Sequence, residues 1–461
     1  MQHPTRGLIR RDTIGAMHDD LAARVDDDFP HLRSELERLI QIPSVSAPGY
    51  DPAEVRRSAE HISDLLTAEG LEDVGLLELD GAHPAVFGQI PAPAGAPTVL
   101  LYAHHDVQPP GPADEWETGP FDPHTQDGRL YGRGASDDKS GVIMHLGAIR
   151  AFAGNPPVGL KVFIEGEEEI GSRHLPAFLE EYAGLLEADV IVIADAQNWR
   201  VGSPALTTSL RGIVGVEVEV RTLRAAQHSG LFGGLYPDAL TSLCRVLATL
   251  HHDDGTVAVE ELVSEEVEGL EFGEEEAARL AGAVEGLQTL GSGTLVSRLW
   301  TRPAISVLAI DAPPLSEAIN QLVPVARAKV SMRIAPGQDV PAALNALRSH
   351  LESHVPWGAE LTIRGTESGE GFSLATTGPA FEAWKEGMRK AWGSEPVEMG
   401  VGGSIPFVAA FSEKLPDAPI LLTGAGDPTS SVHAPNESQD LDDLRKAILA
   451  ETVALRLLAE S

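Results

Sequence analysis

Three short apolar segments of this chain run directly into acidic or histidine residues. The segments and the polar residues after them are 98–102 with His104 and Asp106, 159–164 with Glu165 to Glu169, and 190–194 with Asp195. Helical patterns at 142–153 and 175–186 separate the segments, and this alternation predicts an α/β sheet covered by helices. Because open α/β sheets bind ligands at the carboxyl ends of their strands, we expect these polar side chains to meet at one edge of the sheet.

The pattern of side chains changes after residue 211. Apolar and polar residues then alternate with a period of two in three segments, which predicts strands with one exposed face. These segments are 213–220, 322–334 and 360–364. Helical patterns at 238–250 and 341–354 lie between them, so this region predicts a smaller α+β domain.

A strand of the first type returns late in the chain, at 419–423. We therefore expect a discontinuous metal-binding catalytic domain formed by residues 1–209 and 373–461. The α+β domain of residues 210–372 is then an insertion into it.

The acidic composition limits the partners that this chain can bind. Asp plus Glu number 69 against 34 Lys plus Arg, which gives a formal net charge of −35. A field of this sign repels phosphate backbones, so we expect no nucleic-acid binding. Cys244 is the single cysteine, which excludes an internal disulfide and a Cys-based zinc cluster. Any metal ion must therefore be held by histidine and carboxylate side chains.

The distribution of apolar residues indicates a chain that works in water. We find no apolar run near the roughly 18 residues that a membrane span needs. Residues 1–20 carry basic side chains but lack the apolar centre of a secretory signal. We therefore expect a soluble cytoplasmic protein that does not bind membranes.

The first candidate for metal binding is the segment YAHHDVQP, which begins at Tyr102. Residues two apart at a strand end point to the same side. Asp106 can therefore accept a hydrogen bond from one ring nitrogen of His104 while the other nitrogen binds a metal ion. The alternative is a turn with a purely structural hydrogen bond.

Two further segments place carboxylates beside apolar elements. In LYGRGASDDKSG, Ser136 and Asp137 precede a predicted helix. These residues either cap that helix or leave Asp137 to bridge two cations. The run from Glu165 to Glu169 is either a solvated acidic turn or a group of mutually repelling carboxylates that a cation stabilises.

Two more residues complete the set of candidate ligands. Asp195 is a carboxylate at a strand end, and His433 lies in a loop bounded by glycine and proline. Nitrogen and oxygen ligands suit zinc, with manganese or cobalt as alternatives. Two ions that share one carboxylate would lie about 3.5–4 Å apart, as in other two-metal hydrolytic sites. The sequence therefore predicts a centre of two divalent ions.

Eight motifs, in order over residues 102–437, resemble the M20 metallopeptidase family of dinuclear zinc aminoacylases, carboxypeptidases and dipeptidases. The motifs are YAHHDVQP, LYGRGASDDKSG, EGEEEIGS, the Asp195 strand end, AAQHSGLFGG, SMRIAPG, GGSIP and VHAPNE. HxDVQP together with GRGASDDKSG is most similar to the branch of cytosolic non-specific dipeptidases and carnosinases. His105 stands where that branch usually carries an apolar residue. The resemblance implies an α/β zinc-peptidase domain with a mixed sheet and an inserted α+β lid and dimerisation domain.

The resemblance also implies a role for each residue of the metal site. The implied ligands are Asp137 as the bridge between two ions, His104 and Asp195 on one ion, and Glu169 and His433 on the other. Glu168 is implied to be the general base and acid, and Asp106 to orient His104. The family holds the peptide bond after the bridging aspartate in cis, here between Asp137 and Asp138.

Residues of the inserted domain are implied to contact the substrate. The family counterpart of His228 reaches into the active site of the partner subunit of a homodimer and stabilises the oxyanion. From the residues alone, the preferred interpretation of His228 is a turn histidine beside Ser229 and Gly230. Arg333 ends an alternating strand, where it can pair with a substrate carboxylate or form a surface ion pair. Further candidates for substrate contacts are Gly402, Gly403, Ser404 and Asn320.

Together these features predict metal-dependent hydrolysis of dipeptides or short peptides with a free C-terminal carboxylate. A water activated between two metal ions attacks the amide, with Glu168 as general base. The alternative reaction is N-acyl-amino-acid deacylation, of the aminoacylase or the acetylornithine/succinyl-diaminopimelate deacylase type. A catalytically inactive metal-binding or dimerisation module is a third class, and the presence of Glu168 with all five ligand positions argues against it.

Overall fold

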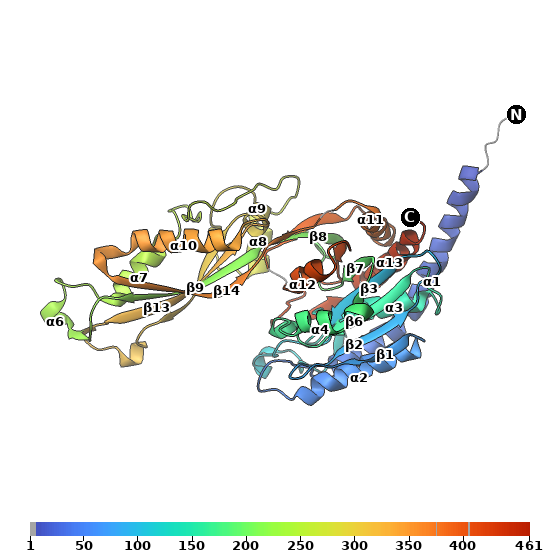
Figure 1. Cartoon of the computed structure of the whole chain (residues 1–461), viewed down its shortest axis with the longest axis horizontal. Helices are drawn as coiled ribbons and strands as arrows, with labels where there is room; N and C mark the ends of the chain where they lie inside the picture. The colour runs from blue at the N-terminus through green and yellow to red at the C-terminus, as the bar shows by residue number, and fades with distance from the viewer. Residues whose placement is uncertain (1–5, 375, 404–405) are drawn as a thin grey trace. The chain divides into compact units, whose positions relative to one another are not determined.

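The computed structural model describes residues 6–374, 376–403 and 406–461, and its elements are labelled in Figure 1. The chain divides into two compact units. The first unit comprises Met1–Thr208, Ala375–Met399 and Pro406–Ser461, and the second comprises Ser209–Leu374 and Gly400–Ile405. Among the described residues, no helix is both long and apolar enough to cross a membrane.

A mixed β-sheet forms the centre of the first unit. Seven of its strands follow the order β1-β2-β6-β3-β7-β17-β8. The four central strands β6, β3, β7 and β17 run parallel to one another, and the pairs outside them are antiparallel. The bounds are β1 Glu72–Leu77, β2 Ala85–Ile90, β3 Thr98–His104, β6 Gly159–Glu165, β7 Val190–Ile193, β17 Ile420–Leu422 and β8 Ala205–Leu210. Because β17 pairs with β7, the C-terminal segment completes the sheet, as the sequence predicted.

Helices cover both faces of this sheet. They are α1 Arg6–Ile40, α2 Pro52–Ala68, α3 Lys139–Ala151, α4 Leu175–Glu181, α5 Ala183–Leu186, α11 Pro379–Trp392, α12 Pro406–Lys414 and α13 Leu441–Leu458. Alternation along β3 decides which side chains meet which helices. Leu101 and Ala103 join the core beneath α1, α3 and α13. Tyr102 faces the other way and stacks on Phe407 of α12, with 4.8 Å between ring centroids.

Three smaller strands and two turns lie beside the main sheet. They are β4 His124–Gln126, β5 Arg129–Tyr131 and β18 Ser438–Asp440, with the 3-10 turns η1 Ala113–Glu115 and η2 Glu168–Ile170. The strands form a separate sheet in the order β18-β5-β4, which pairs Ser438 with Tyr131. This small sheet therefore joins the segment before α3 to the segment before α13.

The second unit is built on a four-stranded antiparallel sheet of order β11-β13-β9-β14. Its larger elements are β9 Gly212–Arg221, α7 Ala239–Ala248, β11 Ala304–Asp311, β13 Val325–Ile334, α10 Val340–His354 and β14 Glu360–Gly369. The smaller ones are β10 Gln227–His228, α6 Ser229–Phe232, α8 Glu274–Ala281, α9 Leu295–Trp300, η3 Leu315–Glu317, β12 Gln321–Leu322 and η4 Pro356–Gly358. Two further short strands, β15 Phe372–Ser373 and β16 Val397–Val401, pair instead with β8 of the mixed sheet. Every second residue of β9, from Val214 to Val220, packs into the core with α7 and α10. This unit is therefore α+β, as the alternating strands predicted.

The boundaries of the two units follow the expected domains to within two residues, except at one segment. The segment Gly400–Ile405 belongs to the second unit, whereas the sequence analysis assigned it to the first domain. The side chain of Arg211 explains the difference, since its Nε donates to the carbonyl oxygen of Gly402 at 3.2 Å. The roles of the units, as catalytic domain and as lid and dimerisation domain, stay predictions.

Candidate metal centre

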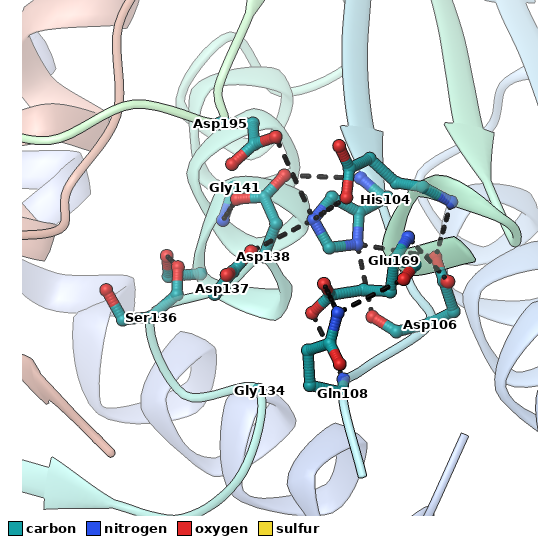
Figure 2. Close-up of polar contacts among 12 residues, drawn as sticks. His104, Asp106, Gln108, Gly134, Ser136, Asp137, Asp138, Gly141, Glu169 and Asp195 are labelled. Carbon is teal, nitrogen blue, oxygen red and sulfur yellow. Dashed lines mark hydrogen bonds and ion pairs between the residues drawn. The ribbon is translucent and has the colours of Figure 1, made fainter. Parts of the chain in front are cut away.

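Neighbouring parallel strands of the first unit deliver the polar side chains of the candidate site. The last residue of β3, His104, pairs with Glu165 at the end of β6. On its other side β3 pairs with β7, whose end lies two residues before Asp195. Figure 2 shows the acidic side chains gathered around the ring of His104. The predicted meeting of polar residues at one sheet edge is confirmed.

The carboxylate of Asp137 lies between two imidazole rings. Its Oδ1 is 3.0 Å from Nε2 of His104, and its Oδ2 is 2.9 Å from Nε2 of His433. The same nitrogen of His433 is 3.1 Å from Oε2 of Glu169. Each oxygen of Asp137 therefore faces a different histidine, which is the arrangement that a bridging carboxylate needs.

Two groups of three side chains could each hold a metal ion. Within each group, ligand atoms of the three residues lie within 4.8 Å of one another. The groups are His104, Asp138 and Asp195, and Asp137, Glu169 and His433. All the donor atoms are imidazole nitrogens and carboxylate oxygens, which fit zinc and similar divalent ions. The donor set thus fits the expected pair of metal ions.

Asp138 belongs to the first of these groups and also has a structural task. It is the N-cap residue of α3, where its Oδ1 accepts from the backbone N–H of Gly141 at 3.2 Å. Its Oδ2 accepts from the backbone N–H of His104 at 3.2 Å. The alternative that Ser136 and Asp137 cap this helix is therefore wrong. The peptide bond between Asp137 and Asp138 is cis, as the family resemblance implied.

Asp106 ties together two parts of the site. Its Oδ1 lies 3.4 Å from Nδ1 of His104 and accepts from the backbone N–H of Glu168 at 3.2 Å. Its Oδ2 accepts from the backbone N–H of Glu169 at 3.1 Å and from Oγ of Ser46 at 2.6 Å. One buried carboxylate therefore fixes both the histidine ring and the turn that carries the two glutamates.

The acidic run after β6 is not a solvated turn. Glu165 and Glu167 are buried, and the side chain of Glu169 is only 3% exposed. The hydroxyl of Tyr102 donates to Glu165 at 2.6 Å, and Nε2 of Gln108 donates to Oε2 of Glu169 at 2.8 Å. These partners hold the carboxylates in place, so the solvated alternative is wrong.

The crowding of carboxylates shifts their protonation. Burial raises the pKa of Glu168 to about 8, and the charges of Glu169 and Asp137 act in the same direction. Burial also raises the pKa of Asp195 well above its ordinary value. Burial opposes ionisation of Asp137 as well, but hydrogen bonds with His104 and His433 bring its pKa below the ordinary range. Divalent cations would relieve this repulsion.

His104 and the neighbouring His105 have different surroundings. Nε2 of His104 faces Asp137, whereas Nε2 of His105 lies 3.0 Å from the backbone oxygen of Pro84. Burial lowers the pKa of His105 to about 4. The structure thus directs the ring of His104, and not that of His105, toward the carboxylates.

The predicted substrate-binding residues belong to the second unit. His228 is exposed, and its Nδ1 accepts from the backbone N–H of Gly230 at 3.0 Å. The backbone oxygen of Asn320 accepts from the N–H of Ser229, which places Asn320 beside His228. Arg333 lies on β13 opposite Ala304. Gly402 and Gly403 follow β16, and Ser404 lies outside the described residues.

Arg211 contacts the loop that is predicted to bind the substrate carboxylate, and the sequence analysis did not single it out. It is buried, and its Nη1 donates to the backbone oxygen of Arg298 at 3.2 Å. A Cβ atom added at Gly402 would lie 2.7 Å from Nη2 of Arg211, so glycine permits this approach. Burial, together with the positive charge of Arg333, lowers the pKa of Arg211 to about 10. Arg211 thus contacts the glycine loop and feels the charge of Arg333, a relationship that no local motif reveals.

The fold and the site define an α/β enzyme with a candidate two-metal centre at the edge of its sheet. The model of Peptidase family M20/M25/M40 matches residues 100–455, and the chain belongs to this family.

Curated relatives and solved structures resemble the chain over most of its length. A cysteinylglycine-S-conjugate dipeptidase from Corynebacterium striatum is 34% identical over 91% of this chain and 95% of its own length. The human β-Ala-His dipeptidase is 29% identical over 77% and 73% of the two chains. The metallo-carboxypeptidase Sso-CP2 from Sulfolobus solfataricus superposes with a TM-score of 0.78 at 27% identity, covering 93% and 99%. The di-peptidase Dug1p from Saccharomyces cerevisiae shares the fold, with a TM-score of 0.80 at 24% identity over 96% and 99%.

Proposed function

We propose that this protein is a metal-dependent dipeptidase, which hydrolyses dipeptides or short peptides that carry a free C-terminal carboxylate. The observation that carries the proposal is the position of Asp137, whose two carboxylate oxygens face one histidine of each ligand group, His104 and His433. Oε2 of Glu168 lies 4.0 Å from Nε2 of His104. Relatives named as dipeptidases support this substrate class. The alternative of N-acyl-amino-acid deacylation is not favoured.

The proposed centre holds two divalent ions, with zinc favoured and manganese or cobalt possible. His104 and Asp195 would hold one ion, Glu169 and His433 the other, and Asp137 would bridge them. Bound there, the ions supply positive charge that makes water more acidic and polarises the scissile carbonyl.

Glu168 is proposed to move the proton in this reaction. Its side chain is 19% exposed, so the attacking water molecule can reach it. A raised pKa suits a group that takes a proton from the attacking water and returns it to the leaving amine near neutral pH. Asp106 supports this role because it accepts the backbone N–H of Glu168 and so fixes the turn.

Residues of the second unit are proposed to bind the substrate carboxylate and the oxyanion. Arg333 would pair with the carboxylate, and the loop of Gly402, Gly403 and Ser404 would add backbone N–H groups. Asn320 is a weaker candidate for the same contact. Because Nδ1 of His228 accepts a hydrogen bond, a neutral ring carries its proton on Nε2, which is then available to donate to an oxyanion.

We also propose that the protein is a homodimer that forms through the second unit. Several large apolar side chains of this unit are exposed, and they are Leu231, Leu235, Val307, Leu308, Ile310, Leu315 and Ile319. Val307, Leu308 and Ile310 belong to β11, the edge strand of the sheet. Exposed apolar side chains grouped in this way mark interaction surfaces. The cytoplasmic location expected from the sequence stays a prediction.

Hydrolysis assays with added metal ions test the proposed function. The protein is treated with EDTA, dialysed, and assayed with Cys-Gly, β-Ala-His and N-acetylated amino acids, with and without Zn²⁺, Mn²⁺ or Co²⁺. We expect dipeptide hydrolysis that EDTA removes and a divalent ion restores. Cleavage of the acetylated amino acids alone would favour the deacylase, and metal-independent hydrolysis would contradict the proposed centre.

A further inference from the structure

Glu437 is a buried carboxylate that accepts four hydrogen bonds from the loop carrying Asp137. It is 0% exposed and lies four residues after His433 in the chain. Its Oε2 accepts from Nη1 of Arg133 at 2.7 Å and from the backbone N–H of Gly134 at 3.0 Å. Its Oε1 accepts from the backbone N–H groups of Ser136 at 2.9 Å and Asp137 at 3.0 Å. Figure 2 shows the course of this loop from Gly134 through Ser136 to Asp137.

The surrounding strands explain why these two distant segments meet. Ser438 pairs with Tyr131 in the small sheet, so Glu437 follows the same register just beyond that pair. The backbone oxygen of Glu437 accepts from the N–H of Gly132 at 2.9 Å, which continues the register by one bond. The side chain then reaches the next turn, where Arg133 balances its charge. The contact is therefore part of a continuous series of hydrogen bonds between the two segments.

We propose that Glu437 is a positioning residue of the metal centre, which holds the bridging Asp137 and the loop of His433 in one fixed arrangement. This inference rests on the proposed two-metal function. The carboxylate fixes the backbone N–H of Asp137, while its own chain leads back to His433. The proposed ligands Asp137 and His433, whose Oδ2 and Nε2 atoms are 2.9 Å apart, thus both depend on Glu437. The side chain of Glu437 itself binds no metal.

The four donors make a carboxylate the only fitting side chain at this position. Each carboxylate oxygen accepts two hydrogen bonds, so all four donors are satisfied. In Glu437→Gln, one of the two oxygens becomes an NH₂ group. That group would face either Arg133 and Gly134 or the N–H groups of Ser136 and Asp137, and in each case donor meets donor. The loop must then shift.

Zinc binding to the apoprotein tests the inference without relying on activity. We expect E437Q to bind Zn²⁺ at least about tenfold more weakly than the wild type in calorimetric titration, as is usual when a partner behind a ligand is lost. The visible absorption spectrum of the Co²⁺-loaded protein should change too, because it reports ligand geometry. E437D keeps the charge opposite Arg133 but is one methylene shorter, so its affinity should lie between those of the wild type and E437Q.

Asp443 offers a matched control in the same unit. It is also a buried carboxylate that accepts hydrogen bonds from distant groups, namely the N–H of Gly202 at 2.9 Å and Nε1 of Trp392 at 2.9 Å. D443N should lower the melting temperature but leave the Zn²⁺ affinity and Co²⁺ spectrum unchanged.

Three results would overturn the inference. The first is wild-type Zn²⁺ affinity and an unchanged Co²⁺ spectrum in E437Q. The second is a loss of affinity in D443N as large as in E437Q. The third is wild-type Zn²⁺ affinity in E437D. This result decides the question if E437Q does not fold. A wild-type protein that binds no zinc, manganese or cobalt would instead overturn the proposed function, and this inference with it.

Discussion

Oδ1 of Asp137 faces the ring of His104 at 3.0 Å. The opposite oxygen of the same carboxylate faces His433 at 2.9 Å. This carboxylate therefore contacts one histidine of each candidate ligand group. Asp138, by contrast, has both oxygens engaged by backbone N–H groups of His104 and Gly141. The two adjacent aspartates therefore have separable tasks.

Substitution of these aspartates distinguishes a ligand from a helix cap. We expect D137N to lose both metal ions, because a neutral amide is a poor bridge between two cations. D138N should keep both ions, and asparagine can still cap α3 through its oxygen. The substitution should destabilise the fold by about 1–3 kcal/mol, because its NH₂ group then faces the buried N–H of His104. Metal content by mass spectrometry and urea unfolding measure the two effects. Loss of metal in D138N with retention in D137N would reverse the assignment.

Replacement of Glu168 should separate chemistry from metal binding. We expect E168Q to lose about 10²–10⁴-fold in kcat, since glutamine cannot carry the proton, while two metal ions still bind. Glu180 is an exposed glutamate of α4, and E180Q is the matched control with unchanged kcat. Activity of E168Q near that of the wild type would exclude Glu168 as the base.

Parts of this site could be predicted from the sequence because each rests on local pattern. Apolar strands that end in His104 or Asp195 indicate the edge of a sheet, and parallel strands bring such ends together. The chain order of these elements also showed that a late strand must return to the sheet. The structure confirms this with the pairing of β17 and β7.

Other features depend on contacts that no local pattern shows. The choice between Asp137 and Asp138 as the cap of α3 is decided by which carboxylate reaches the N–H of Gly141. Arg211 approaches Gly402 only after the second unit has folded. Glu437 acquires its four donors from a segment far away in the chain. Each of these depends on tertiary structure, which spacing and composition do not encode.

Mixing two inactive variants tests whether His228 serves the partner subunit. We expect H228A alone to lose about 10²–10³-fold in kcat, the usual effect of removing one oxyanion donor. A dimer of one H228A chain and one E168Q chain still contains one site with an intact Glu168 and the partner's intact histidine. Co-refolded mixtures of H228A and E168Q should therefore regain activity.

The control for this mixture is each variant co-refolded with itself. Activity that stays at the level of the separate variants, in a preparation shown by light scattering to contain dimers, would place His228 in its own subunit's site or outside the reaction.

The buried pair of His145 and Glu451 predicts a pH-dependent part of stability. Nδ1 of His145 lies 2.9 Å from Oε1 of Glu451, and Nε2 lies 2.9 Å from the backbone oxygen of Tyr102. Burial opposes protonation, but the charge of Glu451, with smaller contributions from Tyr102 and Asp138, raises the pKa of His145 above its ordinary 6.5. The folded state therefore binds a proton that the unfolded state releases at lower pH. This stabilisation is fully present below the unfolded-state pKa of 6.5. It is lost as the pH rises through the higher folded-state pKa of His145.

Comparison of the wild type with H145Q isolates this effect, because groups that titrate alike in both proteins cancel. H145Q should be destabilised by about 3–5 kcal/mol at low pH, since Glu451 loses its partner in a buried site. The difference in unfolding free energy, from urea titrations at pH values on both sides of 6.5, should shrink as the pH rises. H31Q is the control, since the side chain of His31 is 79% exposed. A difference that stays constant or grows with pH would show that the ring of His145 is neutral in the folded protein.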